Sequence, residues 1–238
     1  MSLEIAVVDA SVGGTPARRN LERELSASTT VFAASTGEIP PTPTSPEWTF
    51  DAVVVSGSQT AVYDWIHELT EWGRRVYEAG VPALGICWGH QFFAQALGGR
   101  VVDMHEYELG YEQIERVGAD PLFDGVDETF TSFETHSDRV AALPPGATVL
   151  ARNDVGVQAY RVGDTYGVQF HPEYDRETAT WVVDGKDLPT ERLEAVRAGI
   201  TDDAVAAAAA TKTVFDNFLE IAATSQPTVV ARGARGSR

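Results

Sequence analysis

Three runs of consecutive apolar residues constrain the fold of this chain more than any other feature. They lie within segments 3–9, 51–56 and 81–86, and each run is free of polar side chains. A strand with one face in water alternates apolar and polar residues, whereas a strand covered on both faces reads as a continuous apolar run. The three segments therefore predict buried strands of a sheet that is covered on both sides.

Helical signals separate these strands. Apolar residues recur at helical spacing at Trp65, Leu69, Trp72 and Val76, which is typical of a helix that packs on a core. Further expected elements in this half are helices over 18–25 and 91–97, a strand over 30–34 and a proline-rich loop over 37–46. Strands that alternate with helices predict an α/β fold, with a mostly parallel open sheet and helices on both faces.

The second half of the chain changes character. Shorter strands are expected over 101–117 and 129–140. Two further apolar runs, 157–160 and 166–170, flank Gly163-Asp164, and this pattern predicts a hairpin.

The C-terminal part has a helical pattern, with candidate helices over 191–198 and 202–223. We expect one domain over residues 1–180, a helical extension over 181–223 that packs on the same domain, and a flexible tail over 224–238. The apolar stripe that would pack the extension consists of Val205, Val214, Phe218 and Ile221.

The charge of the chain is strongly negative, with 18 Lys and Arg against 35 Asp and Glu and a formal net charge of −17. An acidic surface repels nucleic-acid phosphates and anionic membranes, so we expect neither partner. The composition resembles that of proteins from salt-adapted organisms; an ordinary acidic protein is the alternative. No basic leader and no run of roughly 18 apolar residues is present, which predicts a cytoplasmic protein.

The segment Gly85-Ile-Cys87-Trp-Gly89 lies between a predicted buried strand and a predicted helix. Small residues on both sides allow a sharp turn that lifts the central side chain out of the sheet, as in a nucleophile elbow. The start of a helix also favours the thiolate form of Cys87. A lone cysteine after a strand is often only a small buried residue, so the segment needs a partner to indicate catalysis.

That partner is His171-Pro-Glu173, which follows the apolar strand 167–170. Residues two apart in an extended segment point the same way, so the carboxylate of Glu173 can reach the imidazole of His171. A base that is oriented by a carboxylate and aimed at a nucleophile is the arrangement of a catalytic triad. Cys87, His171 and Glu173 are therefore the predicted catalytic residues.

The segments 85–91 and 168–174 resemble the two signature motifs of class I glutamine amidotransferases, a family with a flavodoxin-like fold. The resemblance runs from about Leu3 to about Tyr174 and is nearest to single-domain, GMP-synthase-like members. Four further segments match their pattern: Glu108-Leu-Gly-Tyr111, Asp120-Pro-Leu-Phe123, Thr135-His-Ser-Asp138 and Leu143-Pro-Pro-Gly146.

The resemblance implies that Cys87 attacks the γ-carboxamide of glutamine and forms a γ-glutamyl thioester. His171 would protonate the departing ammonia and then activate water, while Glu173 holds His171. The backbone N–H groups of Trp88 and Ser58 would form the oxyanion hole.

The remaining family positions concern the substrate pocket. Gly57, Gln91 and His136 would contribute to binding glutamine. The oxyanion loop departs from the common Gly-Gly-Pro pattern, since Ser58 replaces the second glycine and Gln59 replaces the proline. A backbone donor tolerates a side chain where its φ and ψ are allowed, so the resemblance still implies an oxyanion role for this loop.

Several alternatives stay open. The same triad could serve a γ-glutamyl peptide hydrolase or the glutaminase subunit of a two-chain GMP synthase; a chaperone-like stress protein and an inactive binding module fit the motifs less well. The C-terminal extension favours a free-standing enzyme, and the candidate partner in the other case is a separate synthetase subunit. No ATP-binding loop, no metal-ligand spacing and no cofactor motif are present, so we expect no metal and no cofactor.

We predict that the melting temperature rises between dilute buffer and molar KCl, because salt screens the repulsion among acidic side chains. Thermal unfolding followed by circular dichroism measures this dependence. A melting temperature that stays flat over the series would contradict adaptation to high salt.

Overall fold

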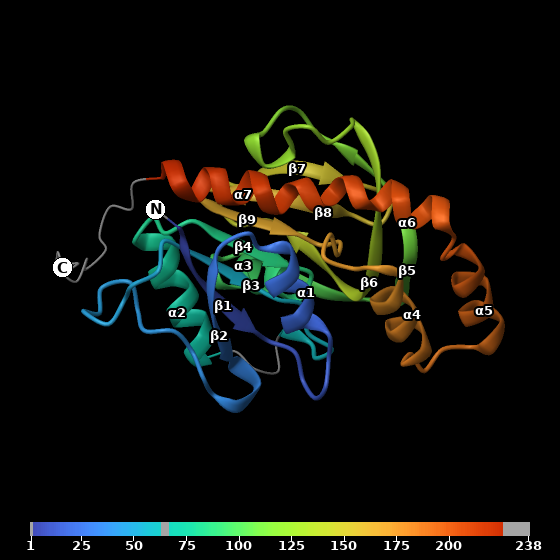
Figure 1. Cartoon of the computed structure of the whole chain (residues 1–238), viewed down its shortest axis with the longest axis horizontal. Helices are drawn as coiled ribbons and strands as arrows, with labels where there is room; N and C mark the ends of the chain where they lie inside the picture. Colours follow the sequence, from blue (N-terminus) through green and yellow to red (C-terminus); the bar gives the residue numbers. More distant parts are fainter. Residues whose placement is uncertain (1, 63–66, 226–238) are drawn as a thin grey trace.

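The computed structural model describes residues 2–62 and 67–225, and these ranges contain one nine-stranded sheet (Figure 1). The strands follow the order β2-β1-β3-β4-β9-β8-β7-β5-β6. The first five are mutually parallel: β2 Ser28–Ala33, β1 Glu4–Asp9, β3 Ala52–Val55, β4 Ala83–Ile86 and β9 Thr165–Val168. The others pair antiparallel: β8 Val157–Val162, β7 Thr148–Arg152, β5 Arg100–Arg116 and β6 Thr129–Ala142.

The antiparallel half differs from the expected sheet in two respects. The expected sheet was mostly parallel, whereas the structure has a mixed sheet in which the predicted hairpin β8–β9 joins the two halves. The strands β5 and β6 are also long, not short, at 17 and 14 residues. A register irregularity between Asp103 and Glu108 interrupts β5, with a positive φ of 58° at His105, although the strand fills nearly the whole expected range 101–117.

Helices cover both faces of the sheet, as the apolar runs predicted. Alternate residues of β1 face opposite ways: Ile5 and Val7 pack with α1 (Ala17–Glu24) and α7 (Thr213–Thr224). Ala6 and Val8 belong to the core under α2 (His67–Glu78) and α3 (Trp88–Ala96). The predicted α/β class is confirmed. Of the predicted apolar stripe of α2, Leu69, Trp72 and Val76 are buried, and Trp65 lies outside the described residues.

The C-terminal helices are α4 Arg176–Asp184, α5 Thr190–Gly199, α6 Asp202–Ala209 and α7. The single helix expected over 202–223 is divided by a short 3₁₀ turn over Ala210–Lys212. Five residues of α7 are buried in the core that it shares with the sheet: Val214, Phe215, Phe218, Leu219 and Ala222. The predicted stripe located two of them, and Val205 and Ile221 are only partly buried.

The predicted division of the chain at residue 180 falls inside α4. Because α7 and the sheet share one apolar core, the extension contacts the main body closely, while the division itself stays a prediction. Most of the predicted tail, residues 226–238, lies outside the described residues. Within the described part of the chain, no helix combines the length and the apolar character that crossing a bilayer requires.

We predict that Phe218→Ala lowers the free energy of unfolding by about 3–5 kcal/mol, because it removes a fully buried ring and leaves a cavity between α7 and the sheet. Urea unfolding measures the change. The matched control is Glu220→Ala, an exposed position on the same helix, which should change stability by less than about 0.5 kcal/mol. A loss below about 1 kcal/mol for Phe218→Ala would mean that α7 does not unfold together with the sheet.

Candidate active site

Cys87 occupies the turn between β4 and α3, where it caps the helix with φ 50° and ψ −99°. A non-glycine residue at positive φ is strained and usually persists where function requires the conformation. The side chain is almost buried, and the first turn of α3 begins at the next residue, Trp88. The predicted sharp turn at Cys87 is therefore present.

The two glycines of the motif are required by close backbone contacts. A Cβ atom on Gly85 would lie 2.3 Å from the carbonyl oxygen of Gly89. A Cβ atom on Gly89 would lie 2.4 Å from the carbonyl oxygen of Val55 in β3. Any larger residue would push α3 away from the sheet and displace Cys87, which explains the Gly-x-Cys-x-Gly spacing.

Cys87 and His171 meet at Gly57, in the loop that follows β3. A Cβ atom on Gly57 would lie 2.9 Å from Cε1 of His171, 3.7 Å from its Nε2 and 3.7 Å from Cβ of Cys87. Glycine at this position therefore allows the imidazole to approach the thiol. The structure brings these predicted residues together from β3, β4 and the segment after β9.

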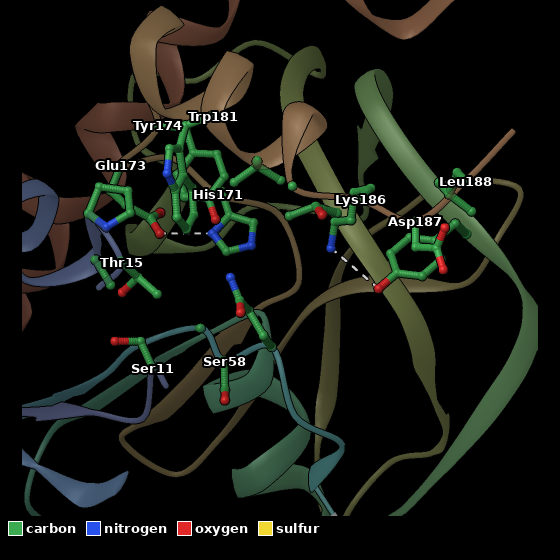
Figure 2. A pocket seen from close by; sticks show the side chains of 18 residues that line it. Ser11, Thr15, Ser58, His171, Glu173, Tyr174, Trp181, Lys186, Asp187 and Leu188 are labelled. Carbon is green, nitrogen blue, oxygen red and sulfur yellow. Dashed lines mark hydrogen bonds and ion pairs between the residues drawn. The ribbon is translucent and has the colours of Figure 1, made fainter. Parts of the chain in front are cut away.

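His171 is held on three sides. Its Nδ1 lies 2.8 Å from Oε1 of Glu173, as predicted, and its backbone N–H donates to the carbonyl of Phe133 at 2.9 Å. Its ring stacks on Tyr174 with the ring centroids 4.1 Å apart. Figure 2 shows the carboxylate of Glu173 directed toward the ring of His171, at one side of the cavity.

The charges around His171 favour its protonated form. Burial alone would lower the pKa of His171, but the carboxylate of Glu173 and the charge of Cys87 together raise it to about 10. At neutral pH the imidazolium form of His171 is therefore favoured. A cation beside a cysteine is the setting in which a thiol nucleophile is activated.

The two proposed oxyanion donors lie beside the thiol. Trp88 and Ser58 both line the same small cavity as Cys87. The hydroxyl of Ser58 accepts a hydrogen bond from the backbone N–H of Thr60 at 3.2 Å, which orders the loop that departs from the family pattern. Their roles as donors stay a prediction.

Gln91 is buried on the first turns of α3, so it is not a solvated helix residue. Its side-chain nitrogen donates to the carbonyl of Asp138 and to Oε1 of Gln169, both at 3.0 Å. Both amide hydrogens are thus engaged within the protein, and the carbonyl oxygen is the atom that Gln91 can offer to a ligand in the cavity.

His136 belongs to a buried cluster that extends behind the small cavity. Its Nδ1 lies 2.8 Å from the carbonyl of Asp138, and its Nε2 lies 2.7 Å from Glu108 and 3.2 Å from Glu134. Burial lowers the pKa of His136, but the two carboxylates outweigh it and raise the pKa well above the ordinary value. Asn153 and Gln158 donate amide hydrogens to Glu108.

Sequence reasoning did not find this cluster. Glu134 and His136 lie two apart on β6 and share a face, and Glu108 of β5 is paired with His136 in the sheet. The alternation of side chains along β6 places Glu134 and His136 on one face, but only the β5–β6 register shows that Glu108 lies opposite them. One donor atom of each residue lies within 4.8 Å of the others, close enough to share a metal ion. An imidazolium of His136 also offsets the charge of the two carboxylates, and the expectation of no metal stays a prediction.

Two cavities meet at the predicted residues. The smaller, of about 150 Å³, is lined by Cys87, Trp88, Gln91, His136 and Ser58. The larger, of about 540 Å³ and drawn in Figure 2, is lined by Gly57, Ser58, His171 and Glu173 together with Tyr174, Trp181 and Leu188. All eight predicted site residues thus line one or both cavities. The motifs did not indicate Tyr107 and Lys186, which line both.

We predict that Glu134→Gln stabilises the protein at pH 8 more than at pH 5. Burial raises the pKa of Glu134 from 4.5 to about 7. A raised folded-state pKa contributes stability below the unfolded value, and this stability is lost as pH rises through the folded value. The glutamine side chain of the Glu134→Gln variant does not ionise, so the variant does not lose this stability as pH rises. Glu108 keeps its contact with His136.

Melting temperatures of both proteins from pH 5 to pH 8 test this expectation. Glu128→Gln, an exposed position just before β6, is the matched control and should shift the melting temperature equally at every pH. The melting temperature of Glu134→Gln minus that of the wild type should become more positive from pH 5 to pH 8. A value that becomes more negative as pH rises would contradict the assignment.

Comparisons with known proteins agree with this geometry. The family described as glutamine amidotransferase class-I matches residues 7–181. A glutamine-hydrolysing GMP synthase of Thermomicrobium roseum is 42% identical over 123 residues, which cover 51% of this chain and 23% of that protein. The chain spans about a quarter of the length of the curated relatives that it matches.

Two solved structures share the fold. A glutamine amidotransferase of Thermotoga maritima superposes with a TM-score of 0.77 at 20% identity, covering 94% of this chain and 100% of that one. A Thermoplasma acidophilum protein assigned to one subunit of GMP synthase gives 0.68 at 25% identity, covering 94% and 96%. The chain therefore belongs to the class I glutamine amidotransferase family and is an enzyme of that class.

Proposed function

We propose that this enzyme hydrolyses the γ-carboxamide of L-glutamine through a γ-glutamyl thioester on Cys87 and releases ammonia. One observation carries the proposal: the strained turn at Cys87 holds the only thiol of the chain beside His171, whose other ring nitrogen is fixed by Glu173. A nucleophile, a base and an orienting carboxylate in this order can cleave an amide.

The first half of the reaction uses the ion pair. The thiolate of Cys87 attacks the amide carbon, and the backbone N–H groups of Trp88 and Ser58 stabilise the oxyanion. His171 then donates its Nε2 proton to the departing nitrogen, which leaves as ammonia while the thioester forms. The C–N bond breaks and the C–S bond takes its place.

The second half uses neutral His171 as a base. It takes a proton from water as the water oxygen attacks the thioester carbon, and glutamate leaves as the C–S bond breaks. The buried carboxylate of Glu173 lies 2.8 Å from Nδ1 of His171 and stabilises the imidazolium that forms again. The resting ion pair is thereby restored.

We predict that Cys87→Ala lowers ammonia release from glutamine on the order of 10⁴-fold or more, because it removes the nucleophile of a unit that acts together. A coupled glutamate dehydrogenase assay measures the ammonia. Circular dichroism and the melting temperature should match those of the wild type, since alanine occupies less space in the same turn. Activity within tenfold of the wild type would disprove the role of Cys87.

A second candidate function is the glutaminase subunit of a two-chain GMP synthase, supported by the GMP synthases among the relatives. From the sequence, the C-terminal extension favoured a free-standing enzyme over a synthase subunit. The likeness to the Thermoplasma acidophilum protein covers 94% of this chain, so most of that extension has a counterpart there. The helices thus do not separate the two functions. The 540 Å³ cavity beside His171 also leaves room for the larger amine of a γ-glutamyl peptide.

Mixing the chain with the ATP-pyrophosphatase subunit of the same organism, XMP, ATP and glutamine separates these candidates. A synthase subunit is expected to give GMP from glutamine only when wild-type chain is present, and none with Cys87→Ala. Ammonium chloride in place of glutamine is the control that shows the synthetase to be active. GMP from ammonium but not from glutamine would show that the chain does not serve this synthetase.

The net charge of −17 supports the further proposal that the enzyme works in a cytoplasm of high ionic strength.

A further inference from the structure

Lys186 is the only lysine or arginine among the described residues that line the two cavities. It lies just beyond α4, after Gly185, and contributes to both cavities. The chain contains only one other lysine, Lys212, whose ammonium group is 2.6 Å from Glu24, away from these cavities. Because basic residues are few in this acidic chain, a lysine that lines both cavities indicates a function in the site.

The ammonium group of Lys186 is positioned but not neutralised. Its Nζ lies 3.3 Å from the hydroxyl of Tyr107, a hydrogen bond drawn as a dashed line from Lys186 in Figure 2. The same Nζ lies 4.6 Å from the centre of the Tyr107 ring. Within residues 2–62 and 67–225, Lys186 forms no ion pair with a carboxylate. A lysine has three donors, so Lys186 retains hydrogens for an anionic ligand.

Around the smaller cavity, acidic side chains outnumber the remaining basic one, the imidazole of His136. Asp103 and Asp138 line the cavity, and Glu108 and Glu134 lie behind His136. Such a site repels a carboxylate unless a cation is placed beside it. Glutamine and every γ-glutamyl amide carry an α-carboxylate, so the substrate must bring an anion into this negative environment.

The reaction direction places that carboxylate. Cys87 lines the smaller cavity, and His171, which protonates the leaving amine in the proposed reaction, lines the larger one. The γ-glutamyl group therefore belongs in the smaller cavity, with the amine directed toward the larger. The α-carboxylate lies at the far end of the glutamyl chain from the reacting carbon, and Lys186 is the lysine that lines the same small cavity as Cys87.

The geometry points to Lys186 as the residue that binds the α-carboxylate of the γ-glutamyl substrate, with Tyr107 holding its ammonium group in place. This assignment rests on the proposed function. Because the contact is remote from the reacting bond, it contributes to substrate binding in the ground state and the transition state alike. Its loss is expected in KM, not in kcat.

The test compares Lys186→Gln with wild type on L-glutamine and on L-glutaminamide, whose α-carboxylate is replaced by a neutral amide. Lys186→Gln should raise KM for L-glutamine about ten- to a hundredfold with kcat within about threefold, the usual size of a lost charged hydrogen bond. It should leave kcat/KM for L-glutaminamide within about threefold. Lys186→Arg should restore part of the affinity, and Lys212→Gln, the matched control, should change neither substrate.

Calorimetric binding of the product L-glutamate and of 4-aminobutyrate, which lacks the α-carboxylate, gives a readout without turnover. Lys186→Gln should weaken L-glutamate at least tenfold and leave 4-aminobutyrate unchanged. Equal losses for both members of either pair, no binding of L-glutamate to wild type, or unchanged KM and Kd would overturn the inference. A wild type that binds L-glutamate through Lys186 yet releases no ammonia from glutamine would refute the proposed function alone.

Discussion

The contact between Gly89 and the carbonyl oxygen of Val55 is the constraint on which the site depends. It sets how closely the start of α3 approaches β3, and a Cβ atom at Gly89 would lie 2.4 Å from that oxygen. Gly85 makes the matching contact with Gly89 from the other side of the turn. Cys87 lies between these two contacts and has a positive φ. It faces Gly57, and the lack of a side chain at Gly57 allows His171 to lie close to the backbone there. Strain at one residue is thus maintained by packing at three glycines.

Around this framework the structure gathers two buried histidines among carboxylates. His171 is paired with Glu173 and lies beside Cys87, and His136 lies between Glu108 and Glu134. In both cases burial opposes the positive charge and the neighbouring anions outweigh it, so the pKa of each histidine is raised. Acidic side chains outnumber basic ones around the smaller cavity. The ammonium group of Lys186, which lines that cavity, is therefore significant for an anionic substrate.

The sequence predicted the features that arise from local rules. Continuous apolar runs identified β1, β3 and β4, and the His-Pro-Glu spacing identified the contact between Glu173 and His171. The expected extended geometry of 171–173 was wrong, because Pro172 and Glu173 form a turn that brings the carboxylate to the imidazole. Features that depend on register or on distant segments were not predictable. The register irregularity near His105 and the Glu108–His136 pairing became visible only in the sheet. Lys186 reaches the site from the segment after α4, and no local pattern marks such an approach.

The central claim is that Cys87 carries the γ-glutamyl group during turnover. Acid quenching of the enzyme with L-glutamine at saturating concentration, followed by proteolysis and mass spectrometry, tests it most directly. Because Cys87 is the only cysteine, the account predicts one γ-glutamyl adduct, on the peptide that contains Cys87, and its removal by hydroxylamine as expected for a thioester. Steady ammonia release with no adduct on that peptide, or with an adduct on another residue, would contradict the account.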